Sequence, residues 1–217
     1  MAQLQFPLDS HAVAEPPPAA DRLRMNPHPD VEFRQVTVPW HLSKALMSYF
    51  PRAGGRHSFM LDLACGRAIH RAVCEHAGFQ YVGLDIDSLD APLLGDAHAL
   101  PFKDHSFEFI LSIATLEHIR YPFVMMQEAY RVLKPGGRLI GTVAFLEPFH
   151  QSWYHHSHLG TANSLLFGGF HIDQIAPHVE WSVLMAQADM ALFPRLPRFA
   201  ARALVLPLYL LHRIWWK

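Results

Sequence analysis

The chain reads Met60-Leu61-Asp62-Leu63-Ala64-Cys65-Gly66-Arg67-Ala68 at its most informative point. The apolar start predicts a short buried strand, the small residues predict a tight turn, and the part from Arg67 onward predicts a helix. A second strand, Tyr81-Val82-Gly83-Leu84, ends on Asp85. A small-residue turn lets a ligand approach the backbone, and an acid at the tip of the next strand can bind hydroxyl groups. This layout is typical of a nucleotide-type site in a doubly wound sheet.

Strands and helices alternate along the rest of the chain. Strands are predicted at 59–63, 80–84, 93–95, 107–113, 139–145 and 170–175. Helices are predicted at 67–77 and 122–133 and in a short segment that ends near Phe167, and a turn is predicted at 134–137. The alternation predicts an α/β fold, namely a Rossmann-like, doubly wound, mainly parallel sheet with helices on both faces.

Composition divides the chain into three parts. Residues 1–35 include Pro16-Pro17-Pro18 and show no apolar period, so we expect a weakly ordered N-terminal segment. Residues 36–180 contain the predicted core. Residues 181–217 form an apolar tail that is predicted to be helical, and its abrupt end in Trp-Trp-Lys is consistent with a truncated chain.

The apolar run at 204–211 lies between Arg202 and Arg213 and is too short to span a bilayer. Two interpretations stay open. The run packs on this domain or on a partner, or residues 200–217 make peripheral contact with a membrane, where Arg and paired Trp residues are common.

The overall balance of residues is that of an ordinary globular domain. The 217 residues carry a net charge of −1 and are 51% hydrophobic and 17% charged. This neutral balance gives no electrostatic reason to bind nucleic acid, so no nucleic-acid partner is expected. Two cysteines do not indicate a disulfide framework, and the N-terminus lacks the pattern of a secretory signal. We therefore expect a cytoplasmic protein.

Four segments of the sequence occur in an order that matches a known family. They are Leu61-Asp62-Leu63-Ala64-Cys65-Gly66, Gly83-Leu84-Asp85-Ile86, Gly95-Asp96-Ala97, and a last segment from Leu116-Glu117-His118 to Lys134-Pro135-Gly136-Gly137. With them, residues 60–145 resemble the class I S-adenosylmethionine-dependent methyltransferases, in particular the small-molecule branch called type 11. The resemblance implies S-adenosyl-L-methionine as the cofactor and a small molecule as the methyl acceptor.

The first two segments supply most of the predicted cofactor site. Ala64 and Gly66 keep the turn small, so that backbone N–H groups can approach the methionine part of the ligand. Asp85 can accept hydrogen bonds from both ribose hydroxyls, a task that suits a carboxylate. Ile86 offers an apolar face for the adenine.

The remaining cofactor contacts come from the resemblance and from the strand ends. Asp96, with the Ala97 backbone, is placed at the adenine amino group, and Ser112, at the end of the fourth strand, is placed near the sulfonium. Asp62 either contacts the ligand or ties the turn together, and both interpretations stay open.

The turn departs from the family at two positions, Ala64 and Ala68, where glycine is usual. A methyl group fits there if the backbone dihedrals are ordinary, but not if φ is positive. With Gly66 as its only glycine, the turn also lacks the Gly-x-Gly-x-x-Gly pattern, which disfavours a nicotinamide enzyme.

Histidines are the candidate acid–base groups, because imidazole titrates near neutral pH. The loop after the fifth strand opens on the acceptor side of the fold and contains several of them, of which His150 and His155 are the predicted base or orienting group. His118 follows a family-like Leu-Glu pair and is predicted to close over the cofactor. No metal is expected, because adjacent histidines point differently and no companion acid or cysteine pair completes a ligand set.

The sequence thus predicts an S-adenosylmethionine-dependent methyltransferase with a small-molecule acceptor. O-methylation is favoured over transfer to nitrogen or carbon, because the loop offers bases that a hydroxyl acceptor needs. The alternative is a non-catalytic protein of the same fold that acts as a cofactor-binding scaffold or accessory subunit, since a fold does not prove activity.

Overall fold

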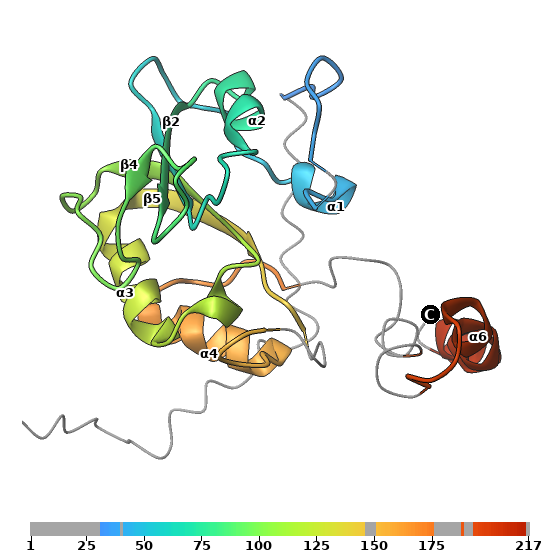
Figure 1. Ribbon diagram of the computed structural model, residues 1–217. Helices are drawn as coiled ribbons and strands as arrows, with labels where there is room; N and C mark the ends of the chain where they lie inside the picture. Colours follow the sequence, from blue (N-terminus) through green and yellow to red (C-terminus); the bar gives the residue numbers. More distant parts are fainter. Residues whose placement is uncertain (1–30, 40, 146–150, 176–187, 189–192, 216–217) are drawn as a thin grey trace, which may run out of the picture.

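The computed structural model describes residues 31–39, 41–145, 151–175, 188 and 193–215 (Figure 1). Within these residues, parallel strands form one sheet in the order β3-β2-β1-β4-β5. The strands are β1 (Phe59–Leu63), β2 (Gln80–Asp85), β3 (Leu93–Leu94), β4 (Phe107–Ile113) and β5 (Leu133–Thr142). The helices are α1 (Lys44–Met47), α2 (Arg71–His76), the 3-10 helix η1 (Leu116–His118), α3 (Pro122–Val132), α4 (His158–Gly168) and α6 (Arg198–Trp215). The predicted Rossmann-like α/β fold is confirmed.

The strand order reverses at β1, with β2 and β3 on one side of it and β4 and β5 on the other. All the strands are parallel, so the carboxyl ends of β1, β2 and β4 meet at one edge of the sheet. In open α/β sheets a ligand binds in the crevice at this switch point. The predicted site residues that follow these strands therefore lie at the same edge of the sheet.

Helices cover both faces of the sheet, as predicted. Figure 1 places α1 and α2 on one side of the sheet and α3 and α4 on the other. One buried core joins Met125 of α3 to Leu61 of β1. The other joins Val73 of α2 to Met60 of β1. Because alternate residues of a strand face opposite sides, Asp62 lies on the same face as Met60, the face that α2 covers.

Three predicted elements differ from the observed ones. The helix expected from Arg67 begins at Arg71, because the preceding turn extends through Ala68 with left-handed backbone at three of its residues. The segment before β1 contains the short helix α1.

The turn predicted at 134–137 lies inside strand β5 as an irregularity: Phe107 pairs with Leu133, but Phe109 pairs with Arg138. The left-handed φ of 77° at Gly136 accommodates the extra residues. The sixth strand expected at 170–175 is not formed. Phe170 instead follows the C-terminal cap of α4 and packs edge-on against Tyr130 of α3, with ring centroids 5.4 Å apart.

Arg131 connects α3 to the loop that follows Asp96. Its guanidinium donates to both carboxylate oxygens of Glu128, to Asp104 at 2.8 Å, and to the carbonyl oxygens of Leu100 and Phe102. Two of the family-like segments are thereby held together. The role of Arg131 in this structure is to fix the loop between β3 and β4.

The tail contains α6, which Figure 1 shows standing apart from the sheet. Ala201 and Val205 are buried beside Ala188, whereas several large apolar residues on the helix are exposed. Among the described residues, no helix combines the length and the apolar character that crossing a membrane requires.

Candidate functional site

The turn after β1 has an unusual backbone. Ala64, Gly66 and Ala68 have φ angles of 58°, 52° and 54°, all in the left-handed region. Glycine adopts this region freely, whereas the Cβ of any other L-residue collides with its own backbone, at a cost of about 1–2 kcal/mol per residue. From the sequence, alanine was expected to fit at these two positions only if φ was ordinary, and the observed φ angles are not. The Ala64–Ala68 turn therefore stores strain at two alanines.

We expect Ala64→Gly and Ala68→Gly each to raise the free energy of unfolding by about 1 kcal/mol, because glycine removes the left-handed penalty and loses part of the gain to unfolded-state entropy. Urea unfolding measures the change. Ala72, which is exposed on α2, provides a matched control, since Ala72→Gly should lower the free energy by about 1 kcal/mol. A loss of stability in both turn variants would contradict the strain.

Asp85 connects the Ala64–Ala68 turn to the end of β2. Its Oδ2 accepts a 2.8 Å hydrogen bond from the Gly66 backbone N–H, and its Oδ1 accepts from the N–H groups of Asp87 and Ser88. Burial would raise the pKa of Asp85, but these backbone donors outweigh it and hold the pKa below its ordinary value. Asp85 is therefore a fixed, charged carboxylate at the switch point.

Asp62 is fully buried beneath the same turn. Its Oδ2 accepts hydrogen bonds from Tyr81 Oη at 2.7 Å and from His70 Nδ1 at 2.9 Å. His70 Nε2 in turn lies 2.6 Å from His41 Nε2. Burial, reinforced by the Asp62 charge, raises the pKa of Tyr81, so its phenol remains a donor. The structure therefore gives Asp62 the role of tying the turn, and Oδ1 is left without a hydrogen-bond partner among the described residues.

Asp96 lies at the start of the loop after β3 and is held by a neighbour. Its Oδ1 accepts from the His98 backbone N–H at 2.8 Å and from His98 Nδ1 at 2.6 Å, and these contacts lower the pKa of Asp96. His98 Nε2 accepts from the Tyr121 backbone N–H at 3.1 Å, so Nδ1 is the ring nitrogen that donates to Asp96. Ala97 is buried in the core. Among the described residues no hydrogen bond to Asp96 Oδ2 is present, so this oxygen can accept one from a ligand.

Two further predicted positions differ strongly in exposure. Ile86, directly after Asp85, is 68% exposed despite its apolar side chain. Ser112 is buried in β4 opposite Gly141. The chain leaves the sheet after it through Ala114, whose φ of 50° is also left-handed.

Glu117, a fully buried residue of η1, holds the loop after β5, which the sequence places on the acceptor side. Its Oε1 accepts from the Ala144 backbone N–H at 3.1 Å, after the end of β5. Its backbone carbonyl accepts from the N–H groups of Trp153 and Tyr154 in the following loop. Oε2 has no hydrogen-bond partner among the described residues. One glutamate thus connects the ends of two strands to the loop.

His156 is the buried histidine of this loop and is 6% exposed. Its Nε2 has no hydrogen-bond partner among the described residues, and the nearby Leu116 carbonyl and Glu117 carboxylate both favour its charged form. Burial lowers the pKa of His156 despite both opposing contacts, so the ring is neutral near pH 7.

The predicted acid–base residues lie differently. His155 is exposed beside His156. His118 is exposed at the end of η1 and, with Gln151, Ser152 and Trp153, lines a hollow of about 380 Å³. His150 lies outside the described residues. Of these candidates, the structure brings His118 together with the loop.

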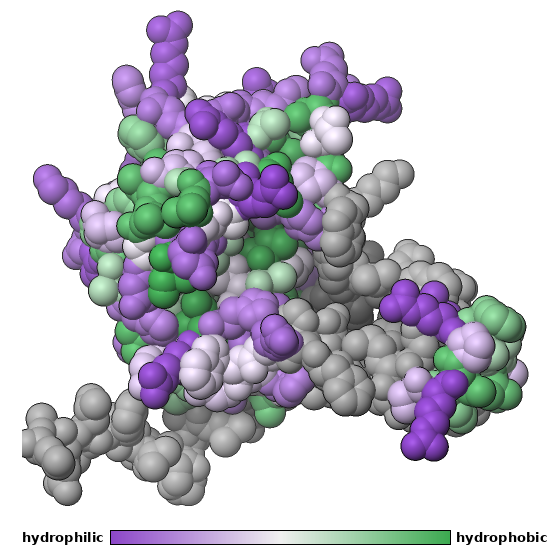
Figure 2. All heavy atoms as spheres, in the orientation of Figure 1, coloured by the Kyte–Doolittle hydropathy of each residue, from purple (hydrophilic) through white to green (hydrophobic). Residues whose placement is uncertain are grey.

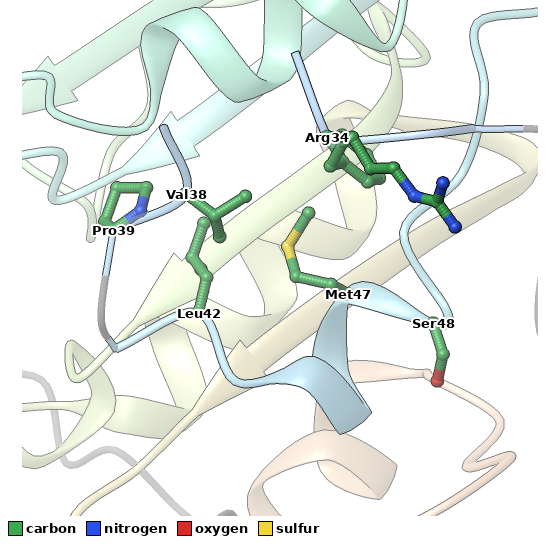
Figure 3. Close-up of a pocket in the computed structure, with 7 residues that line it drawn as sticks. Arg34, Val38, Pro39, Leu42, Met47 and Ser48 are labelled. Carbon is green, nitrogen blue, oxygen red and sulfur yellow. The ribbon is translucent and has the colours of Figure 1, made fainter. Parts of the chain in front are cut away.

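A second hollow, of about 460 Å³, lies beside α1 (Figure 3). Its lining includes Val38, Leu42 and Met47, and no predicted site residue contributes to it. Figure 3 shows that these apolar side chains point toward one another. We assign this hollow to the packing of the segment before β1.

Sequence reasoning missed five residues that shape the site. They are His41, His70, Tyr81, Glu117 and His156. Each acts through a contact with a residue distant in sequence or through burial that only the folded chain creates. The sequence pattern that pointed to one of them was the pair His155-His156, because adjacent residues point in different directions and one of the two can face inward.

Known proteins share the segment that carries this geometry. Residues 61–141 match the family model described as a methyltransferase domain. The ubiquinone/menaquinone biosynthesis C-methyltransferase UbiE of Ruegeria sp. is 39% identical over 97 residues, which cover 42% of this chain and 34% of that protein. The demethylmenaquinone methyltransferase of Streptomyces avermitilis is 32% identical over 105 residues, which cover 43% of this chain and 44% of that protein. The matched part of the chain thus spans less than half of the length of each of these relatives.

Solved structures agree with the fold. A Haloferax volcanii protein solved with the Trm112 methyltransferase activator has a TM-score of 0.52 and 25% identity, over 61% of this chain and 69% of that chain. An S-adenosylmethionine-dependent methyltransferase of Mesorhizobium loti also has a TM-score of 0.52, at 18% identity, over 62% of this chain and 83% of that chain. Residues 61–141 therefore match a methyltransferase domain, and the described residues share the fold of solved methyltransferases, in agreement with the resemblance that the sequence motifs carry.

Proposed function

We propose that this protein transfers a methyl group from S-adenosyl-L-methionine to a small organic acceptor. The observation that carries the proposal is the 2.8 Å hydrogen bond from Gly66 N to Asp85 Oδ2. It joins the Ala64–Ala68 turn to the acid at the end of β2, at the switch point of a methyltransferase domain.

The residues at this edge fit the cofactor. Asp85 is charged and retains lone-pair capacity for ribose hydroxyls, because a carboxylate has about four acceptor positions. Asp96 keeps Oδ2 for the adenine amino group, and the exposed face of Ile86 suits the adenine ring. Ala64, Gly66, Ala97, Ser112 and the buried Asp62 complete the proposed site. S-adenosyl-L-methionine would supply an activated methyl group there.

We infer a hydroxylated aromatic acceptor, on the strength of the relatives' names. The relative from Ruegeria sp. is named a C-methyltransferase, and the name of the Streptomyces avermitilis relative does not state the atom, so the preference for oxygen that the sequence favoured gains no support from them. Removing a ring hydroxyl proton increases electron density on the oxygen and on neighbouring ring carbons, and either atom can then take the methyl group. Transfer would break the methyl–sulfur bond with its electron pair on sulfur and form a bond from methyl to the acceptor, whose hydroxyl proton would go to a base; for transfer to carbon, loss of the ring hydrogen and return of a proton to oxygen would then restore the aromatic ring.

His156 is the base that we favour over His150, His155 and His118. Its Nε2 is buried without a hydrogen-bond partner among the described residues, and its lowered pKa keeps the ring unprotonated near pH 7. An acceptor hydroxyl would supply the missing donor. Because the ring is 6% exposed, the loop must open for an acceptor to reach it.

Calorimetry with S-adenosylhomocysteine, the demethylated product, tests the cofactor part of the proposal. We expect saturable binding of one ligand per chain. A chain that binds neither this product nor S-adenosyl-L-methionine is not the proposed enzyme. Binding without transfer of labelled methyl to reduced demethylmenaquinone or related dihydroxy aromatic acceptors would favour the alternative, a cofactor-binding scaffold.

We further propose that this protein is cytoplasmic and makes peripheral contact with a membrane through α6. The sequence from 198 to 217 contains Arg198, Arg202, Arg213 and Lys217 but no acidic residue. Phe199, Leu204, Leu210 and Leu211 of this helix are exposed. Figure 2 shows hydrophilic and hydrophobic residues side by side on its surface. A basic helix with exposed apolar residues suits the interface of an anionic bilayer.

Sedimentation with phosphatidylglycerol vesicles measures this contact. We expect the double change Leu210→Asp, Leu211→Asp to weaken vesicle binding by about tenfold or more, since a charge opposes burial among acyl chains. Leu89→Asp is the control, because Leu89 is 92% exposed on the sheet domain and should not affect binding. Equal vesicle binding by the double variant and the unchanged protein would remove this proposal.

A further inference from the structure

We propose that His70 and His41 are positioning residues, which hold the Ala64–Ala68 turn in its left-handed conformation against the strain of its two alanines. The inference rests on the proposed function, because it takes this turn as the place where the cofactor approaches the backbone. It gives a role in cofactor affinity to residues 31–50, which precede the matched methyltransferase domain.

The contact between Asp62 and His70 spans the turn. Asp62 precedes it in β1, His70 follows it before α2, and Oδ2 and Nδ1 are 2.9 Å apart. The Gly66 N–H is bonded to Asp85 from the middle of the turn. The strained segment is therefore fixed at both ends and at its centre. A break in any one contact gives the two alanines room to return to ordinary dihedrals.

In the hydrogen bond between His70 and Asp62, the histidine is the donor and the carboxylate is the acceptor. A buried carboxylate is only an acceptor, so His70 carries a proton on Nδ1 and donates it. Tyr81 donates to the same oxygen, Oδ2. Two donors on one buried oxygen fix the orientation of the Asp62 side chain, since a buried polar atom without a hydrogen-bond partner is costly.

His41 extends this connection to the segment before β1. The 2.6 Å contact between the two Nε2 atoms requires one ring to donate and the other to accept. The segment is itself firmly packed: Leu42 and Phe50 are buried, and Phe50 contacts Phe33 edge-on with ring centroids 5.5 Å apart. Figure 3 shows Leu42 directed toward the apolar neighbours Val38 and Met47. His41 thus presents a fixed partner to His70.

The turn needs the hydrogen bonds between Asp62 and His70 and between His70 and His41 because Ala64 and Ala68 are strained. A turn with glycine at 64 and 68 would adopt φ near 55° without strain. The chain instead combines strained residues with a buried hydrogen-bonded connection across them. We therefore expect the effect of His70 on cofactor affinity to depend on which residues occupy positions 64 and 68.

Calorimetry with S-adenosylhomocysteine on the full chain tests this dependence. We expect His70→Phe to weaken binding about tenfold, the loss typical of a removed hydrogen bond to a charged group. His70→Asn should retain most of the affinity, because its amide nitrogen can replace Nδ1 as the donor to Asp62. The same His70→Phe change should cause a much smaller loss when it is made in a protein that carries Ala64→Gly and Ala68→Gly and is compared with the protein that carries the two glycines alone.

His76→Phe is the matched control. His76 also lies in α2 and contacts the earlier segment, through the Glu32 carbonyl at 2.6 Å, but does not touch Asp62. This variant should bind the ligand normally. Should His70→Phe fail to fold, His41→Phe takes its place, with a smaller loss that the two glycines again reduce.

The outcomes separate the two proposals. An unchanged protein that does not bind S-adenosylhomocysteine overturns the proposed function and this inference with it. Normal binding by the unchanged protein, with no loss in His70→Phe and His41→Phe or with a loss that the glycines leave in place, overturns this inference alone.

Discussion

Asp85→Ala should weaken S-adenosylhomocysteine binding by about 100-fold, the equivalent of two charge-assisted hydrogen bonds of about 1.4 kcal/mol each. The carboxylate is held in place by Gly66, Asp87 and Ser88 and stays charged because its pKa is lowered. It is therefore ready to accept both ribose hydroxyls without rearrangement. Calorimetry near pH 7 measures the dissociation constant.

Two variants separate ligand contact from folding. Asp85→Asn keeps the size and one acceptor oxygen but lacks the charge, and its loss should lie between those of the alanine variant and the unchanged protein. Asp87→Ala is the control, since Asp87 is exposed two residues further on. If Asp85→Ala unfolds at the same temperature as the unchanged protein and binds the ligand equally well, the ribose assignment is wrong.

His156→Asn should lower kcat by about 100-fold or more, the lower end of what a positioned general base contributes. Asparagine keeps a polar side chain at this position but has no basic nitrogen in the place of Nε2 to take a proton. The affinity for S-adenosylhomocysteine should stay the same, because the cofactor residues lie on other strand ends. Transfer of labelled methyl to the hydroxylated aromatic acceptors gives the rate.

His155→Asn is a matched control one residue away. His155 is exposed, so its replacement should leave both the rate and the affinity near those of the unchanged protein. A large loss in His155→Asn with a normal rate in His156→Asn would return the role to the residue that the sequence favoured. Equal rates in all three proteins would exclude both histidines as the base.

The strands could be predicted well because they depend on local patterns. β1 and β4 begin and end where the apolar runs of the sequence do. Asp85 was found in the same way, since it ends an apolar run after a small-residue turn. The strand expected at 170–175 was wrong: apolar and polar residues alternate there, but Phe170 packs against Tyr130 of α3 and the segment does not pair with the sheet.

The acceptor side was less predictable, because its chemistry depends on burial. His155 and His156 are adjacent and identical in type, yet one is exposed and the other buried. Burial lowers the pKa of His156, and the fold leaves its Nε2 without a hydrogen-bond partner among the described residues. Neither effect has a local sequence pattern, so the sequence pointed to the loop and not to the residue.

The sequence by itself determined the sheet, the class of domain and the position of the cofactor turn, because periodicity and short motifs are local properties of a chain. Only the tertiary structure decided how that turn is held. Ala64 and Ala68 could be judged once their φ angles were known, and the supports of Asp62 came from Tyr81, His70 and His41. Hydrogen bonds between residues far apart in sequence follow from packing, and packing is a property of the whole fold.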